Sequence, residues 1–124
     1  MQWLAVAAGG ALGALLRFTI STYWLPVQGG QFPWATFLIN IFGSFLIGVS
    51  YIVIVEKGVW PIEWKWILIA GFLGAFTTFS TFSLEAITLW LQHQPGTAIM
   101  YVLSSVFGGL LAAALGLHLA PKWF

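Results

Sequence analysis

The chain has 124 residues, of which 60% are hydrophobic and 18% aromatic, while only 6% are charged. Soluble domains carry about a quarter charged residues, so this composition indicates an integral membrane protein with a single domain. The net charge of +1, without any cluster of Lys or Arg, excludes nucleic-acid binding. The absence of cysteine excludes disulfides, thiolate metal sites and a catalytic thiol.

Four stretches are long and apolar enough to cross a bilayer, which takes roughly 20 residues. They cover residues 3–24, 33–55, 64–91 and 97–119, and glycine, proline and polar residues separate them. All eight tryptophans lie at or just outside the ends of these stretches, where interfacial aromatic residues are expected. We therefore predict one transmembrane domain, residues 1–124, with both termini on the same side of the membrane.

Small residues recur every four positions along the predicted helices, as in Ala5, Gly9 and Gly13. This spacing is typical of transmembrane helices that pack closely. Four short helices leave little room for a permeation path that is also shielded from lipid. A pore or substrate site is therefore expected between subunits.

Polar residues inside a span are costly in lipid and are candidates for function. In the second span Thr36, Asn40 and Ser44 are four residues apart, so they form one polar stripe on the helix. The other spans contain Arg17, Thr77, Thr78, Ser80, Thr81, Ser83, Glu85, Ser104 and Ser105.

The third span has an unusual middle, where two glycines precede the adjacent Thr77 and Thr78. These residues have poor helix propensity. A break there would free backbone carbonyls, and such carbonyls can hold a dehydrated alkali cation at mid-membrane. The alternative is that both threonines bond to preceding carbonyls and only bend the helix.

Phe79 and Phe82 are three residues apart and so share a helix face. Such pairs most often serve packing, but the positive edge of an aromatic ring can also meet an anion. Asn40, Thr81 and Ser105 supply amide and hydroxyl donors. Together these groups would suit a small, strongly hydrated anion, although Asn40 could equally make only an interhelical hydrogen bond.

The two charged residues inside the spans each have two interpretations. Arg17 could attract anions in a vestibule, or its side chain could snorkel to the lipid headgroups. Glu85 lies shortly before Trp90, so it could reach the membrane interface. It could instead be a carboxylate that couples transport to protons.

Three segments together resemble the Fluc (CrcB) fluoride channel family. They are residues 9–18, 36–48 and 71–85, and the most specific part is the Thr-Thr-Phe-Ser-Thr-Phe run of residues 77–82. The resemblance implies an all-α integral membrane fold with four transmembrane helices per subunit, the third broken near its middle. It further implies an antiparallel, dual-topology homodimer in the lipid bilayer of a bacterial plasma or inner membrane.

The same resemblance implies a function, which is passive export of fluoride through two pores at the homodimer interface, with a structural sodium ion at the centre. No enzyme activity is implied. The pore residues would be Asn40, Phe79, Phe82, Ser105, Thr81 and Ser80. A vestibule or polar track would contain Arg17, Glu85 and Thr36. Backbone carbonyls of Gly74 and Thr77 from both subunits would hold the sodium.

Two other functions stay open at this point. A proton-coupled exporter of the small multidrug resistance type is also a short four-helix protein, but that class has its glutamate in helix one, whereas Glu85 lies in helix three. A membrane assembly subunit without transport would leave Asn40 without a purpose.

The distribution of lysines bears on the orientation in the membrane. The predicted side of the termini carries Lys57, Lys65 and Lys122. Insertion in both orientations favours balanced loops, so this asymmetry is in tension with dual topology.

Overall fold

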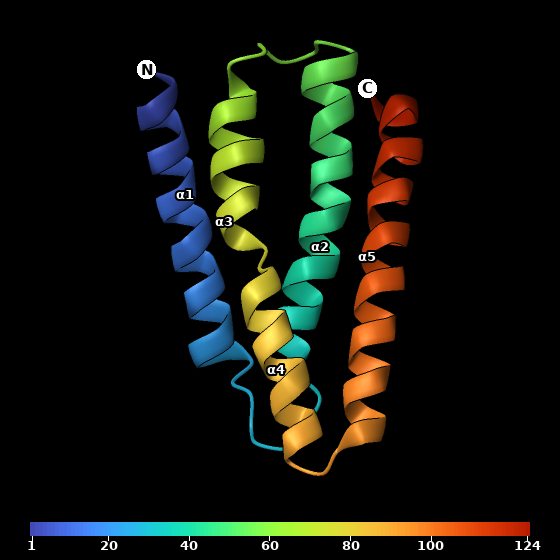
Figure 1. Cartoon of the computed structure of the whole chain (residues 1–124). Helices are drawn as coiled ribbons and strands as arrows, with labels where there is room; N and C mark the ends of the chain where they lie inside the picture. The colour runs from blue at the N-terminus through green and yellow to red at the C-terminus, as the bar shows by residue number, and fades with distance from the viewer.

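The computed structural model of the chain describes all 124 residues, as helices joined by short connections. Four helical segments are long and apolar enough to cross a membrane: Gln2–Trp24, Trp34–Glu56, Lys65–Leu91 and Pro95–Trp123. They stand side by side, and both termini lie at the same end of the bundle (Figure 1). The prediction of an all-helical chain with four helices of membrane-spanning length is confirmed.

Three of the spans include wider, π-helical turns. The elements in chain order are α1 (Gln2–Thr19), η1 (Ile20–Trp24), α2 (Trp34–Ser50), η2 (Tyr51–Glu56), η3 (Lys65–Leu73), α3 (Gly74–Phe76), α4 (Phe79–Leu91) and α5 (Pro95–Trp123). The last helix continues past the expected end at residue 119 and includes Pro121. Lys57 Nζ donates to the Pro121 carbonyl at 2.9 Å, which satisfies one of the terminal carbonyls of this longer helix.

Each of the three connections contains one residue in the left-handed backbone region, namely Gly30 (φ 79°), Gly58 (φ 59°) and His93 (φ 62°). Glycine adopts this conformation without steric cost. The last connection ends at Pro95, the first residue of α5. Proline is well tolerated at this position, because an N–H in the first turn of a helix has no partner within the helix. These breakers explain why the chain reverses within so few residues.

The first span packs against the third, and the two run in the same direction (Figure 1). Gly9 lies directly against the carbonyl of Ile67, and Gly13 against the carbonyl of Phe72, so that a Cβ at either glycine would overlap with backbone. The glycine spacing seen in the sequence thus brings α1 into backbone contact with the third span, as expected for closely packed helices.

The second span packs in the same way against α5, again in parallel (Figure 1). Gly48 lies against the Ala113 carbonyl, where a Cβ would come within 2.5 Å of the oxygen, and Gly116 lies against the carbonyl of Phe45. Spans that alternate in the sequence are therefore the close partners. The third span bridges the two pairs, because α4 also contacts both α2 and α5.

The buried interior is small. One cluster joins α4 to α5 through Phe82, Ala86, Leu89, Ala98 and Tyr101, and another consists of Ile39, Leu73 and Phe76. Most other large apolar side chains point outward, as expected for helices whose surroundings are lipid or other protein rather than water.

Candidate functional site

The third span is interrupted near its middle. The segment α3 ends at Phe76, and Thr77 (φ −79°, ψ 157°) and Thr78 (φ −150°, ψ 123°) have extended backbone before α4 begins at Phe79. The Thr78 hydroxyl accepts a hydrogen bond from the Thr81 amide at 3.2 Å and so caps the N-terminus of α4. The Thr77 hydroxyl donates to the Leu73 carbonyl at 2.8 Å, so of the two threonines Thr77 makes the bond to a preceding carbonyl.

Asn40 on α2 holds this interruption from the side. Its Nδ2 donates to the Thr78 carbonyl at 2.9 Å, and its Oδ1 accepts from the Thr78 amide at 2.8 Å. One side-chain amide therefore satisfies both backbone groups of an extended residue, which would otherwise be costly inside a membrane. The two bonds also fix which way round the amide lies, because only Nδ2 can donate. The second N–H of Nδ2 is not used by this pair.

The same arrangement removes the usual partners of two carbonyls. In an uninterrupted helix the Thr78 amide would donate to Gly74, and the Thr81 amide to Thr77. Here these amides donate to Asn40 Oδ1 and to the Thr78 hydroxyl instead. The carbonyls of Gly74 and Thr77, the pair assigned to sodium in the sequence analysis, thus lack their helical donors.

A cation here would depend on such oxygens, because no group of three or more His, Asp or Glu side chains is placed to hold a metal ion. Hard cations such as sodium prefer oxygen ligands, carbonyls included. Gly74 is exposed, and a Cβ built on it would meet its nearest neighbour, the Ile69 carbonyl, at 3.6 Å. The surface beside these carbonyls is therefore open in the single chain.

Arg17 reaches the same region from α1. Its Nε donates to the Ala75 carbonyl at 3.0 Å, and the bond is partly buried. This carbonyl belongs to the last turn before the interruption and would pair with the Phe79 amide if the helix continued. The polar contact of Arg17 is thus the C-terminal end of α3 rather than a carboxylate.

A second polar group lies one helical turn earlier on α2. The buried Thr36 donates its hydroxyl to Glu85 Oε1 at 2.5 Å, and the Tyr101 hydroxyl is 3.5 Å from the same oxygen. Residues from α2, α4 and α5 therefore meet at one carboxyl group. A cavity of about 160 Å³ between α4 and the connection at residues 27–33 is also lined by Glu85. This connection lies at the end of the bundle opposite the termini (Figure 1).

The two candidate pore phenylalanines face different surroundings. Phe79 is 79% exposed, whereas Phe82 is buried and its ring centroid lies 5.1 Å from that of Tyr101. The two phenylalanine rings are 5.8 Å apart between centroids. Of the neighbouring hydroxyl residues, Ser80 is exposed and Thr81 is half-buried. The pair therefore extends from the interior of the chain to its outer surface.

Ser105 has a buried hydroxyl without any hydrogen-bond partner, which is rare inside proteins and calls for an explanation. The position of Ser105 along the bundle follows from the parallel packing of α5 on α2, because Gly109 faces the Ser44 hydroxyl across that contact. One turn earlier on both helices lie Ser105 and Asn40. The unpartnered hydroxyl is therefore at the level of the Asn40–Thr78 pair.

Hydrogen bonds bring three of the predicted site residues, Thr36, Asn40 and Glu85, into one polar column between α2 and α4, whereas Gly74, Phe79 and Ser80 are exposed. Sequence reasoning missed two members as site residues, Thr78 and Tyr101. Thr78 had a readable signal, because threonine is a common residue at the N-cap of a helix. Tyr101 is four residues before Ser105, so the two share a face of α5.

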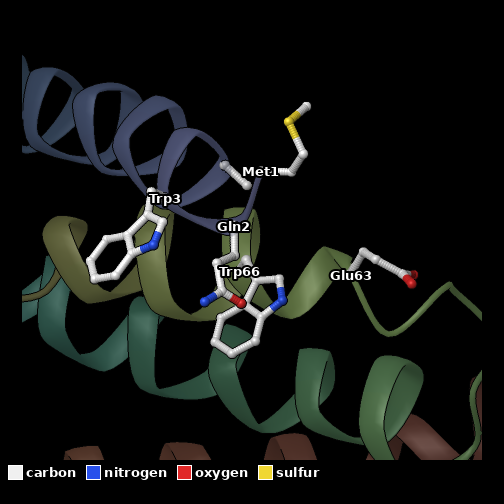
Figure 2. A pocket seen from close by; sticks show the side chains of 6 residues that line it. Met1, Gln2, Trp3, Glu63 and Trp66 are labelled. Carbon is white, nitrogen blue, oxygen red and sulfur yellow. The ribbon is translucent and has the colours of Figure 1, made fainter.

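A cavity of about 470 Å³ at the end of the bundle that carries the N-terminus contains none of the predicted site residues. Met1, Gln2, Trp3, Ala5, Glu63 and Trp66 line it. Figure 2 shows the indoles of Trp3 and Trp66 on either side of Gln2, with Glu63 set apart on the connection that precedes η3. Two tryptophans at a helix end are typical of the membrane interface, and the polar column lies elsewhere.

Comparison with known proteins gives the relationship of the chain. The family described as "CrcB-like protein, Camphor Resistance (CrcB)" matches residues 4–117. The chain belongs to the CrcB family. The family expected from the three sequence segments is confirmed, and the CrcB match extends over all four spans.

Relatives of this CrcB protein have names that state a function. One named "Fluoride-specific ion channel FluC", from Saccharophagus degradans, is 49% identical over 97% of this chain and 90% of its own length. Another of that name, from Hahella chejuensis, is 45% identical over 92% of this chain and 90% of its own length. "Fluoride-specific ion channel FluC 2" from Bacillus cereus is 46% identical over 96% of this chain and 97% of its own length. These names describe ion channels and not enzymes.

Proposed function

We propose that the chain is a passive, fluoride-selective ion channel that exports fluoride across the plasma membrane of a bacterium. The names of its CrcB relatives support this function. The structural observation that carries it is the Asn40–Thr78 pair. This pair fixes the interruption of the third span and orients the Asn40 amide. The exposed Phe79 directly follows the interruption. Packing alone requires none of these features.

The proposed working unit is an antiparallel, dual-topology homodimer with two pores along the subunit interface. The support comes from where the candidate residues lie in the single chain. Phe79 is 79% exposed, and Ser80 and Gly74 are also exposed. A path that uses these groups needs a second wall that excludes lipid. A second copy of the chain would supply the same groups from the other side.

In the proposed pore, fluoride exchanges part of its hydration shell for donors of the protein. The second N–H of Asn40 Nδ2 is available for this purpose, because the first donates to Thr78 and the amide cannot turn round. The unpartnered Ser105 hydroxyl lies at the same level and can also donate. Ring edges of Phe79 and Phe82, with the Ser80 and Thr81 hydroxyls, would continue the path along α4.

The proposed polar track continues toward the end opposite the termini through Thr36 and Glu85. The Thr36 hydroxyl is already committed to Glu85 Oε1. The carboxyl group is therefore held in place by α2 and, through Tyr101, by α5. We assign it the role of fixing the mouth of the pore rather than that of binding the anion directly.

The free carbonyl oxygens of the interruption also fit a structural sodium ion, which we propose between the subunits. Carbonyls of Gly74 and Thr77 lack their helical donors because the amides of Thr78 and Thr81 are bonded elsewhere. Two such carbonyls from each subunit would make an all-oxygen site of the kind that alkali cations prefer. When bound, the ion would join the two interrupted spans electrostatically.

Ion efflux from liposomes tests the proposed function. Purified protein is reconstituted with internal fluoride or chloride, and valinomycin carries potassium as the counter-charge. We expect fast fluoride efflux, negligible chloride efflux, and no fluoride efflux when valinomycin is left out. Equal efflux of both anions would contradict selectivity. Efflux that is independent of valinomycin but driven by a pH gradient would instead support the proton-coupled exporter, with Glu85→Gln as its diagnostic variant.

A further inference from the structure

Arg17 ends a stripe of residues on α1 that faces the third span. Gly9, Gly13 and Arg17 are four residues apart and therefore share a helix face. The two glycines lie against the carbonyls of η3, and Arg17 Nε donates to the carbonyl of Ala75 in α3 at 3.0 Å. Because the glycines allow backbone contact, the position of Arg17 relative to α3 is set by helix packing and not by its side chain alone.

The carbonyls at the end of α3 are divided among different partners. A helix leaves its last carbonyls without intrahelical donors, and in a membrane water does not replace them. The Leu73 carbonyl accepts from both the amide and the hydroxyl of Thr77, at 3.1 and 2.8 Å. The Ala75 carbonyl accepts from Arg17. This leaves the carbonyls of Gly74, Phe76 and Thr77 without their helical donors, and those of Gly74 and Thr77 are the proposed sodium ligands.

We propose that Arg17 is a positioning residue for the cation site: by holding the Ala75 carbonyl, it fixes the end of α3 so that the Gly74 and Thr77 carbonyls stay oriented for sodium. The inference rests on the sodium site proposed above. It gives Arg17 a role that neither of its two interpretations from the sequence includes, because its Nε donates to a backbone carbonyl of the third span.

Three physical features favour arginine for this role. A cation at a helix C-terminus is stabilised by the helix dipole. The guanidinium donates in a fixed plane, so it orients the carbonyl it binds more strictly than a lysine ammonium does. Without this donor, the Ala75 carbonyl would be one more free oxygen in the last turn, and the turn could rotate to present it in place of Gly74.

The test measures how sodium affects the protein by two readouts. The first is the thermal unfolding midpoint in detergent as a function of sodium, with N-methyl-D-glucamine as the replacement cation. The second is fluoride efflux from liposomes at the same sodium concentrations. The variants are Arg17→Gln, which removes the charge, and Arg17→Lys, which keeps it. Lys57→Gln is the matched control, because Lys57 also donates to a backbone carbonyl, that of Pro121, but far from α3.

We expect Arg17→Gln to raise the half-saturating sodium concentration about tenfold in both readouts, as for loss of one hydrogen bond to a charged group. Efflux at saturating sodium should largely recover. Arg17→Lys should give a smaller shift and Lys57→Gln none. A half-saturating concentration that is unchanged in Arg17→Gln, while the unsubstituted protein responds to sodium, overturns the positioning role. No sodium response in the unsubstituted protein refutes the sodium site itself, and the inference falls with it.

Discussion

Replacing Asn40 by aspartate changes a single donor into an acceptor with almost no change in shape. The Thr78 amide keeps its partner, but the Thr78 carbonyl loses the donor that lies 2.9 Å away and faces an oxygen instead. The lost bond is worth about 1 kcal/mol, and a buried carbonyl left unsatisfied costs a further ~1–3 kcal/mol. We therefore expect Asn40→Asp to lower the free energy of unfolding by roughly 2–4 kcal/mol.

The effect on conduction should be larger than the effect on stability. An ionised carboxylate about 4 Å from a passing anion repels it by about 4 kcal/mol at an effective dielectric constant near 20. Such a barrier slows permeation by roughly a thousandfold, so fluoride efflux should fall below detection even where the protein remains folded.

Fluoride efflux from liposomes and thermal unfolding in detergent measure the two effects separately. Ser44→Ala is the control, since Ser44 lies one turn away on the same polar stripe and donates no hydrogen bond in the structure. It should change the free energy of unfolding by less than about 0.5 kcal/mol. If Asn40→Asp unfolds like the unsubstituted protein, the two hydrogen bonds do not hold the interruption. If its fluoride efflux is unchanged, Asn40 does not line the pore.

Three further substitutions separate packing from permeation. Phe79→Ile should reduce fluoride efflux without lowering the unfolding midpoint, because the ring is 79% exposed in the subunit; a large loss of stability would show that it is a packing residue. Phe82→Ile should reduce efflux and also destabilise the subunit by about 1 kcal/mol, because its ring packs on Tyr101. Gly13→Ala should prevent tight packing of α1 and sharply lower the yield of folded protein. Gly96→Ala should leave the yield unchanged, because a Cβ at Gly96 would meet only open space. Equal yields from both glycine variants in size-exclusion chromatography would contradict the packing described for α1.

The four spans could be predicted because two independent signals coincide at their ends. Apolar length locates each helix, and tryptophans such as Trp24, Trp34 and Trp90 mark the interface. The apolar stretch predicts an end at residue 119, whereas α5 continues to Trp123. In the structure Lys57, from a different connection, satisfies the Pro121 carbonyl, and such tertiary contacts have no local trace in the sequence.

The site was predictable in its residue types but not in its connections. Polar residues stand out against apolar spans, so Asn40 and Glu85 were visible as candidates. Their partners were not, because the Thr78 backbone carries no signal for a side chain on another helix, and Tyr101 is an ordinary aromatic residue until packing brings it to Glu85. The two interpretations of Asn40 also turn out to be compatible, since an interhelical bond uses only one of its N–H groups.

The pairing of alternate spans has a consequence for how the protein is made. A chain that emerges from the ribosome one span at a time cannot build this bundle from successive hairpins. The face of α1 around Gly13 stays bare until the third span has been made, and the face of α2 around Gly48 stays bare until α5 has entered the bilayer. The contact between α2 and α5 therefore cannot form until α5 has been made, and a chain cut short before Gly116 leaves Gly48 uncovered.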